Sequence, residues 1–222
     1  MRKECLLFAK QGRAVWISHL DLTRVLARAF ARARVPLAYS EGFNPHPYLS
    51  SALPLPVGVS SGCEVLFFGV TDTADLSGVT DALNGALPEG LSILRLLEPL
   101  PDIKDIAAAA YRYKLRWTSQ ADCQAALALF DGRTLPIEKK TKKGRQLIDM
   151  KPLIQSVNIQ RQEGGHVLLD CILSGGQTPA SPTALLNVFG THATLPASYG
   201  IDRQRVLSAS GGDWIPNRQK TC

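Results

Sequence analysis

The chain has 222 residues, of which 45% are hydrophobic and 20% charged, a balance typical of folded globular proteins and not of disordered chains. No apolar run approaches the roughly 20 residues that a membrane-spanning helix needs, and the N-terminal residues lack the pattern of a secretory signal. We therefore expect a cytoplasmic protein with no membrane partner, built as one medium domain or two small ones.

Positive charge is concentrated in two segments, although the net charge is only +6. Residues 1–34 carry eight Lys and Arg against two acidic residues, and residues 133–151 carry seven against two. Such segments attract polyanions, and the commonest polyanions of the cytoplasm are nucleic acids. The five cysteines are scattered, without the paired spacing of a metal or redox site, so we expect reduced thiols and no metal.

The first half reads as strand, helix, strand, strand, helix, strand, which is the order of a ferredoxin-like split βαβ unit. Five of these elements are expected at 3–10 (strand), 20–34 (helix), 63–70 (strand), 75–87 (helix) and 90–100 (strand). Ser18 and Asp21 form a capping-box pattern that places the start of the first helix at Ser18, and Pro36 stops this helix. We predict a first domain over residues 1–100.

The second half repeats this order of elements. They are expected at 109–119 (strand), 120–132 (helix), 136–151 (basic hairpin), 166–173 (strand), 182–190 (helix) and 203–209 (strand). Ser181 and Pro182 suit the N-cap and the first position of the second helix. We therefore predict an α+β protein of tandem ferredoxin-like units with antiparallel sheets, the second over residues 107–222. A single larger α+β domain is the alternative.

The first helix carries a basic stripe, because Arg24, Arg28 and Arg32 recur every four residues and so share one face. Guanidinium groups on such a face can grip successive phosphates, although a solvated stripe with Asp21 paired to Arg24 is the alternative. His19 in the first turn is a candidate general base or a packing residue. The candidate phosphate-binding residues of this half are Arg13, Arg24, Arg28 and Arg32.

The segment "YSEGFNPHP" at 39–47 is a loop in which Pro45 and Pro47 hold the neighbouring backbone extended. A rigid loop suits recognition, because little entropy is lost when its site is ordered. The aromatic residues could stack on unpaired bases and the polar ones could bind base edges or sugar hydroxyls. The candidate RNA-binding residues are Tyr39, Ser40, Phe43, Asn44 and His46. In the alternative, the prolines shield a sheet edge and Phe43 fills the core.

The basic hairpin at 136–151 could lie against a nucleic-acid backbone without reading its sequence, or it could be a solvated loop. Its candidate residues are Lys139, Lys140, Lys142, Lys143 and Arg145. The sequence contains no phosphate-binding, dinucleotide-binding, zinc-protease or α/β-hydrolase motif, and its histidines lack metal-ligand spacing. We therefore expect no cofactor.

The motifs "ISHLDLTRVLARA", "YSEGFNPHP" and "LPLPVGVSS", with the Glu64 that follows, resemble the radical-SAM-linked family. This family is a bacterial domain of unknown function, found free-standing or fused to cobalamin-binding-type radical SAM enzymes. The resemblance implies a connection with RNA and with a radical SAM partner. This chain lacks the cysteine triplet that holds the cluster of such enzymes, so it would act as an accessory. Tandem ferredoxin-like units are also similar to CRISPR repeat-processing endoribonucleases, an analogy of fold alone.

Three hypotheses result. The first is an RNA-binding accessory protein that acts with a radical SAM enzyme in RNA- or ribosome-related modification or processing, with no preference for DNA inferable. The second is a metal-independent endoribonuclease in which His19 or His46 moves the proton of a ribose hydroxyl and an arginine stabilises the phosphate charge. The third is a protein-binding scaffold for the radical SAM enzyme, in which the basic segments only maintain solubility.

Overall fold

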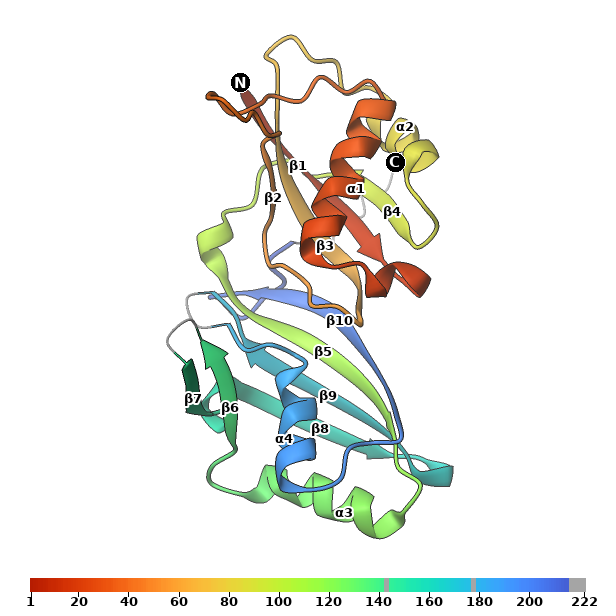
Figure 1. The fold of residues 1–222 in the computed structure, drawn as a ribbon, viewed down its shortest axis with the longest axis vertical. Helices are drawn as coiled ribbons and strands as arrows, with labels where there is room; N and C mark the ends of the chain where they lie inside the picture. Colours follow the sequence, from red (N-terminus) through yellow and green to blue (C-terminus); the bar gives the residue numbers. More distant parts are fainter. Residues whose placement is uncertain (142–143, 177–178, 216–222) are drawn as a thin grey trace. The chain divides into compact units, whose positions relative to one another are not determined.

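The computed structural model describes residues 1–141, 144–176 and 179–215, with the backbone alone for 139–141. The chain divides into two compact units, Met1–Ile103 and Lys104–Cys222. Each unit contains an antiparallel sheet with two α-helices (Figure 1). Within the described part of the chain, no helix is long and apolar enough to cross a membrane.

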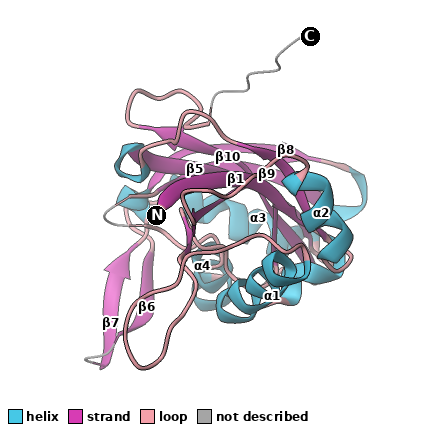
Figure 2. Cartoon of the chain, turned by 90° about the horizontal axis from the view of Figure 1, so that it is seen from above, coloured by secondary structure: helices cyan, strands magenta, loops and turns pink. Residues whose placement is uncertain are grey.

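Unit 1 is a ferredoxin-like βαββαβ fold. Its elements are β1 (Arg2–Lys10), the short 3-10 helix η1 (Gly12–Trp16), α1 (His19–Arg32), β2 (Leu49–Ser51), β3 (Val59–Val70), α2 (Val79–Ala86) and β4 (Leu91–Leu96). The strand order is β4-β1-β3-β2 and every neighbouring pair is antiparallel. Both helices lie on the same face of this sheet (Figure 2). The predicted fold class is confirmed for this unit, because split βαβ connections produce this order.

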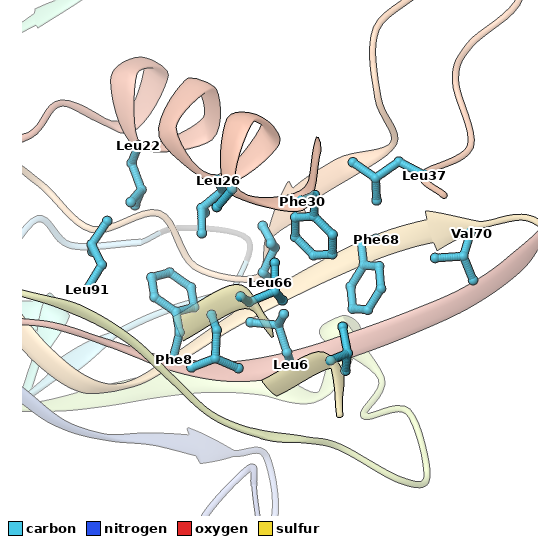
Figure 3. Close-up of a cluster of buried hydrophobic side chains, with 14 of the residues drawn as sticks. Leu6, Phe8, Leu22, Leu26, Phe30, Leu37, Leu66, Phe68, Val70 and Leu91 are labelled. Carbon is cyan, nitrogen blue, oxygen red and sulfur yellow. The ribbon is translucent and has the colours of Figure 1, made fainter. Parts of the chain in front are cut away.

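The core of unit 1 forms where the apolar stripe of α1 meets alternate residues of β1 and β3 (Figure 3). Leu22, Leu26 and Phe30 are four residues apart and are buried on one face of α1. The rings of Phe30 and Phe68 lie 4.9 Å apart between centroids and are tilted by 50°, a geometry typical of packed aromatic pairs. This packing leaves the opposite face of α1 to solvent.

The start of α1 agrees with the capping-box prediction. The backbone N–H of Asp21 donates to Ser18 Oγ at 3.2 Å, and that hydroxyl donates to Asp21 Oδ2 at 2.7 Å. Ser18 is therefore the N-cap and His19 the first helical residue. The helix ends at Arg32, before the predicted end, because Arg34 adopts a left-handed conformation with φ of 57° ahead of Pro36.

Unit 2 repeats the same topology with a hairpin inserted. Its elements are β5 (Ile106–Arg116), α3 (Gln120–Ala128), β6 (Pro136–Thr141), β7 (Gly144–Asp149), β8 (Ile154–Arg161), β9 (His166–Ser174), α4 (Ala184–His192) and β10 (Ser198–Ser208). The sheet order is β10-β5-β9-β8, again antiparallel, and β6 pairs with β7 as a separate hairpin. The tandem ferredoxin-like prediction is therefore confirmed for this unit as well.

Two predicted helix starts are wrong, each for a local reason. The helical pattern expected from residue 75 becomes helical only at Val79, because the Asp75 carboxylate accepts the backbone N–H of Ser77 at 2.9 Å, a turn that competes with the helix. In unit 2, Thr183 and not Ser181 is the N-cap of α4. The carbonyl of Ser181 instead accepts the N–H of Ala184 at 3.0 Å.

The cysteines within the described residues are free, and two of them are strongly affected by burial. Burial disfavours the thiolate and raises the pKa of Cys171 to about 12 and that of Cys5 to about 11. Below pH 9 both thiols are neutral whether the chain is folded or unfolded. Between about pH 9 and the folded pKa values of about 11 (Cys5) and about 12 (Cys171), the thiols ionise mainly in the unfolded chain, so their contribution to stability is lost as the pH rises through this range.

We expect the free energy of unfolding to fall between about pH 8 and about pH 10.5, with about 2 kcal/mol of the loss due to Cys171. Urea titrations of the wild type and of Cys171→Ala at the two pH values check this. The variant should lose about 2 kcal/mol less than the wild type over this range. An identical loss in both proteins would show that the Cys171 thiol does not cause the alkaline destabilisation.

Candidate nucleic-acid interface

The 39–47 loop is closed by its own hydrogen bonds. Tyr39 and Pro47 form an isolated antiparallel bridge. The N–H of Ser40 donates to the carbonyl of His46 at 2.9 Å, and the N–H of His46 donates to Ser40 Oγ at 3.1 Å. Gly42 in the tip has a φ of 118°, which a residue with a side chain rarely adopts. Residues 41–45 are therefore presented on a loop that these hydrogen bonds constrain.

Phe43 at the tip of the loop is fully exposed, with a relative accessibility of 111%. The alternative in which Phe43 fills the core is therefore wrong. Burying a side chain of this kind is worth about 1.5–3 kcal/mol, and the fold does not gain this free energy from Phe43. Tyr39 at the base of the loop is 54% exposed. The loop thus offers two aromatic side chains to a ligand.

His46 is oriented by Ser40, whose Oγ lies 2.9 Å from His46 Nδ1. Because Ser40 Oγ already accepts the His46 backbone N–H, its own hydrogen can be donated to Nδ1. In a neutral imidazole the ring proton then lies on Nε2, which can donate to a ligand. Asn44 and His46 are both exposed, so their polar groups are accessible from solvent.

A cavity of about 470 Å³ lies beside the loop within unit 1. It contains aromatic surface from Tyr48 and Phe67 and the amine-bearing side chain of Lys3. Its walls come from Met1, Lys3, His46–Ser50, Phe67–Gly69 and Leu100–Ile103. A volume of this size can hold a small planar ligand. Sequence patterns did not single out this cavity, because its walls come from four separate segments.

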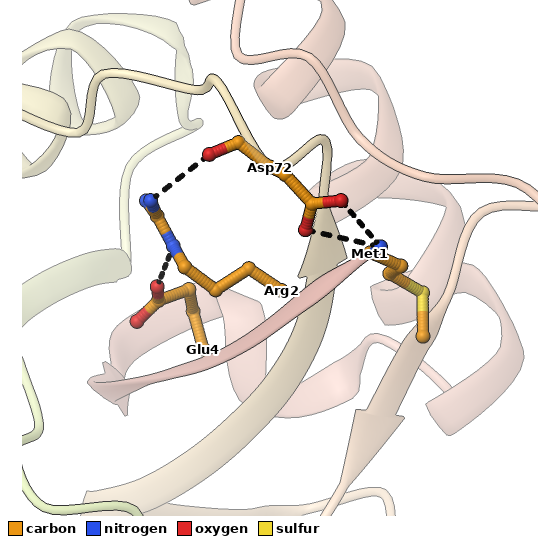
Figure 4. Close-up of polar contacts among 4 residues, drawn as sticks. All are labelled: Met1, Arg2, Glu4 and Asp72. Atoms are coloured by element: carbon orange, nitrogen blue, oxygen red, sulfur yellow. Dashed lines mark hydrogen bonds and ion pairs between the residues drawn. The ribbon is translucent and has the colours of Figure 1, made fainter.

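The start of β1, which forms one wall of the cavity, is held by ionic contacts (Figure 4). The N-terminal amine of Met1 lies 3.1 Å from both carboxylate oxygens of Asp72. The Arg2 guanidinium pairs with Glu4 and donates to the backbone carbonyl of Asp72. These contacts fix the strand end near the 39–47 loop.

The basic stripe of α1 is exposed along its whole length. Arg24 Nη1 pairs with Asp21 Oδ1 at 2.9 Å, with both side chains more than half exposed, and such a surface pair contributes little to stability. Arg32 donates to the carbonyl of Ala86 at 3.3 Å. Among the described residues, Arg28 has no hydrogen-bonding or ionic partner. The three arginines therefore form the predicted exposed stripe, and the pairing of Asp21 with Arg24 that was expected for a solvated stripe is also present.

The basic hairpin forms in unit 2 as β6 and β7. Lys139 and Lys140 lie in β6, but their side chains are outside the described atoms, and Lys142 and Lys143 are outside the described residues. Arg145 Nη1 pairs with Glu138 Oε2 at 3.2 Å, and both side chains are exposed.

The structure does not bring His19 and His46 together. His19 lies two residues after Ile17, and the Ile17 carbonyl accepts a hydrogen bond from Lys10, the last residue of β1. This places His19 near the end of β1. His46 lines the cavity with Met1 and Lys3 at the start of that strand. The two histidines therefore lie near opposite ends of β1. Arg13, in η1, is exposed near the His19 end.

Comparison with known proteins identifies no match among curated proteins. Among solved structures, a chain of a Cbf5–Nop10–Gar1 complex is similar with a TM-score of 0.48 and 11% identity, over 91% of this chain and 48% of that one. A chain of the archaeal box H/ACA sRNP Nop10–Cbf5 complex is similar with a TM-score of 0.44 and 11% identity, over 91% of this chain and 47% of that one.

The chain thus spans about half the length of each of these structural neighbours. A family model, described as an uncharacterized protein conserved in bacteria, matches residues 4–182 and so covers unit 1 and most of unit 2. The chain belongs to this family, DUF2344.

Proposed function

We propose that the protein binds single-stranded RNA through the 39–47 loop. The observation that carries this proposal is Phe43, a fully exposed aromatic side chain on a loop closed by its own hydrogen bonds. Unpaired bases stack on such rings regardless of their sequence. Because the loop is already ordered, little conformational entropy is lost when a base binds.

Polar groups beside Phe43 support recognition of RNA. The exposed amide of Asn44 can donate and accept, and Ser40 orients the ring of His46 so that Nε2 can donate. Groups of this kind bind base edges and the ribose 2′-hydroxyl, which distinguishes RNA from DNA. The loop therefore combines a stacking surface with hydrogen-bonding groups.

Positive charge in both units supports binding to the RNA backbone. Arg24, Arg28 and Arg32 are exposed on α1, and Arg145 is exposed on the β6–β7 hairpin. Arginine binds phosphate through forked donors, and such contacts add affinity without reading sequence.

We further infer, from the resemblance of its motifs to the radical-SAM-linked family, that the protein acts in the cytoplasm as an accessory to a radical SAM enzyme. It would hold an RNA substrate while the partner supplies the chemistry. No group of three or more metal-ligating side chains is clustered in the part of the chain that the structure describes.

Fluorescence anisotropy with a labelled single-stranded RNA tests the proposal. We expect the Phe43→Ala variant to bind about tenfold more weakly, because stacking of one base contributes about 1–3 kcal/mol. The unfolding midpoint should not change, since Phe43 contributes no burial. Leu94→Ala, at a half-exposed apolar position of β4, is the matched control and should bind normally.

Equal binding by the wild type and Phe43→Ala, or no binding even at low salt, rules out this mode of RNA recognition. Recovery of a radical SAM partner without RNA would favour the scaffold hypothesis. Cleavage of the RNA in the presence of a chelator would favour the ribonuclease hypothesis, and His19→Ala and His46→Ala would then show which histidine takes part.

A further inference from the structure

Two large apolar side chains are exposed at the N-terminal end of α1. Trp16, the last residue of η1, is 68% exposed, and Leu20 in the first turn of α1 is 61% exposed. They precede Arg24, Arg28 and Arg32 at the same interval of four residues. Leu20 and the three arginines therefore form one row on the outward face of the helix.

Trp16 is fixed beside the start of this row. A Cβ atom placed at Gly58 would lie 3.4 Å from Trp16 Cζ3, so the indole lies against this glycine while most of its surface is in solvent. The Gly58 N–H donates to the Val15 carbonyl at 2.8 Å, which ties the two segments together. The indole is thus held in place but mostly uncovered, and the core does not use it.

We propose that one extended strand of unpaired RNA lies along the outward face of α1. One of its bases would stack on Trp16 and another, at the other end of the strand, on Phe43. The inference rests on the proposed function and specifies its ligand as single-stranded RNA long enough to span the helix. Its phosphates would contact the guanidinium groups of the arginine row.

Spacing and charge favour this ligand. Positions four apart on α1 are separated by about 6 Å along the axis, and a helix of 14 residues is about 21 Å long. The arginine row thus presents positive charge at regular short intervals, as a strand presents phosphates. An unpaired strand also carries a base at every phosphate, so one ligand can reach both aromatic ends. We expect a site of about six nucleotides, within the range of roughly 4–16 known for single-strand platforms.

Tryptophan emission gives a direct test, because Trp16 is exposed while Trp117 and Trp214 are only 2% and 6% exposed. Emission that iodide can quench should therefore come from Trp16. Binding of an unlabelled oligouridine of about 12 nucleotides should quench this emission by stacking. The Trp16→Phe variant should lose both the iodide-accessible emission and its quenching by RNA, which would assign the signal to Trp16.

The affinity of Trp16→Ala for RNAs of about 4 and about 12 nucleotides completes the test. In the wild type the longer RNA should bind more tightly, since the shorter RNA cannot reach both Trp16 and Phe43. We expect the ratio of the two affinities to be about tenfold smaller in Trp16→Ala than in the wild type. Leu94→Ala is again the matched control, and thermal melting checks that the variants fold.

The outcomes separate the two proposals. If RNA binds in a Phe43-dependent way but neither tryptophan emission nor the Trp16→Ala affinity changes, the path along α1 is wrong and the proposed function stands. If no RNA binds the wild type, both are wrong. The path along α1 is also wrong if Trp16→Ala weakens binding of double-stranded RNA as much as binding of single-stranded RNA. It is likewise wrong if Trp16→Ala loses a protein partner while its affinity for RNA is unchanged.

Discussion

Replacing Arg24, Arg28 and Arg32 together by glutamine should weaken binding of single-stranded RNA about a hundredfold at about 0.1 M salt. Each phosphate contact on a single strand contributes about 0.7 to the slope of log affinity against log salt, so three contacts contribute about 2. Glutamine is a good helix former, and the three side chains are exposed, so α1 should remain folded. Anisotropy titrations at several salt concentrations measure both the affinity and the slope.

The matched control removes an equal number of positive charges, three, by replacing exposed residues of unit 2 with glutamine. These residues are Lys114, Arg116 and Arg133. This variant should bind with nearly the same salt slope as the wild type, because a distributed net charge changes encounter rates more than it changes specific contacts. If the two triple variants lose affinity equally, net charge explains the binding. The row on α1 would then not be a phosphate-binding surface.

The fold was predictable because periodicity and order of elements constrain it strongly. The four-residue spacing of Leu22, Leu26 and Phe30 indicates which face of α1 is buried. The order of strands and helices predicted both split βαβ units. The expected ranges omit strands β2 and β8 and shift several strand ends. Other errors lie at helix ends, where a single side-chain contact determines the first helical residue. The Asp75 carboxylate accepts the backbone N–H of Ser77, and this local turn replaces the first predicted turn of α2. The spacing of apolar residues contains no information on such a side-chain hydrogen bond.

The candidate site was predictable only in part. The prolines of the 39–47 loop indicated rigidity, but whether Phe43 is buried or exposed depends on the path of the chain in three dimensions. The distance between His19 and His46 depends on β1, which separates them although they are near in sequence. Trp16 and Leu20 did carry a signal, since they extend the four-residue interval of the arginines. That interval alone does not distinguish an exposed tryptophan from a packed one.

Lys10 is a further residue whose environment sequence patterns did not indicate, and its replacement by methionine should lower the free energy of unfolding by about 1–3 kcal/mol. Its side chain is fully buried, and Nζ donates to the Ile17 carbonyl at 2.9 Å. Burial lowers the pKa of Lys10, and the nearby Glu64 carboxylate opposes this shift. Methionine keeps the length of the side chain but removes the donor and the charge, so the Ile17 carbonyl loses this bond and the buried Glu64 loses a favourable cation.

Urea denaturation of Lys10→Met and of Lys3→Met, an exposed lysine of the same strand, measures this effect, and the control should change by less than about 0.5 kcal/mol. Adding Glu64→Gln to Lys10→Met should recover about 1–3 kcal/mol relative to additivity, because the two charges interact. Lys10 holds the Ile17 carbonyl, and Ile17 directly follows Trp16. Loss of this bond should let the Trp16 indole move further into solvent, so Lys10→Met should also increase iodide quenching of Trp16. A loss below about 1 kcal/mol with unchanged quenching would mean that Lys10 does not hold η1 against the sheet, and that the start of α1 is positioned by the Ser18 cap and the Gly58 contact alone.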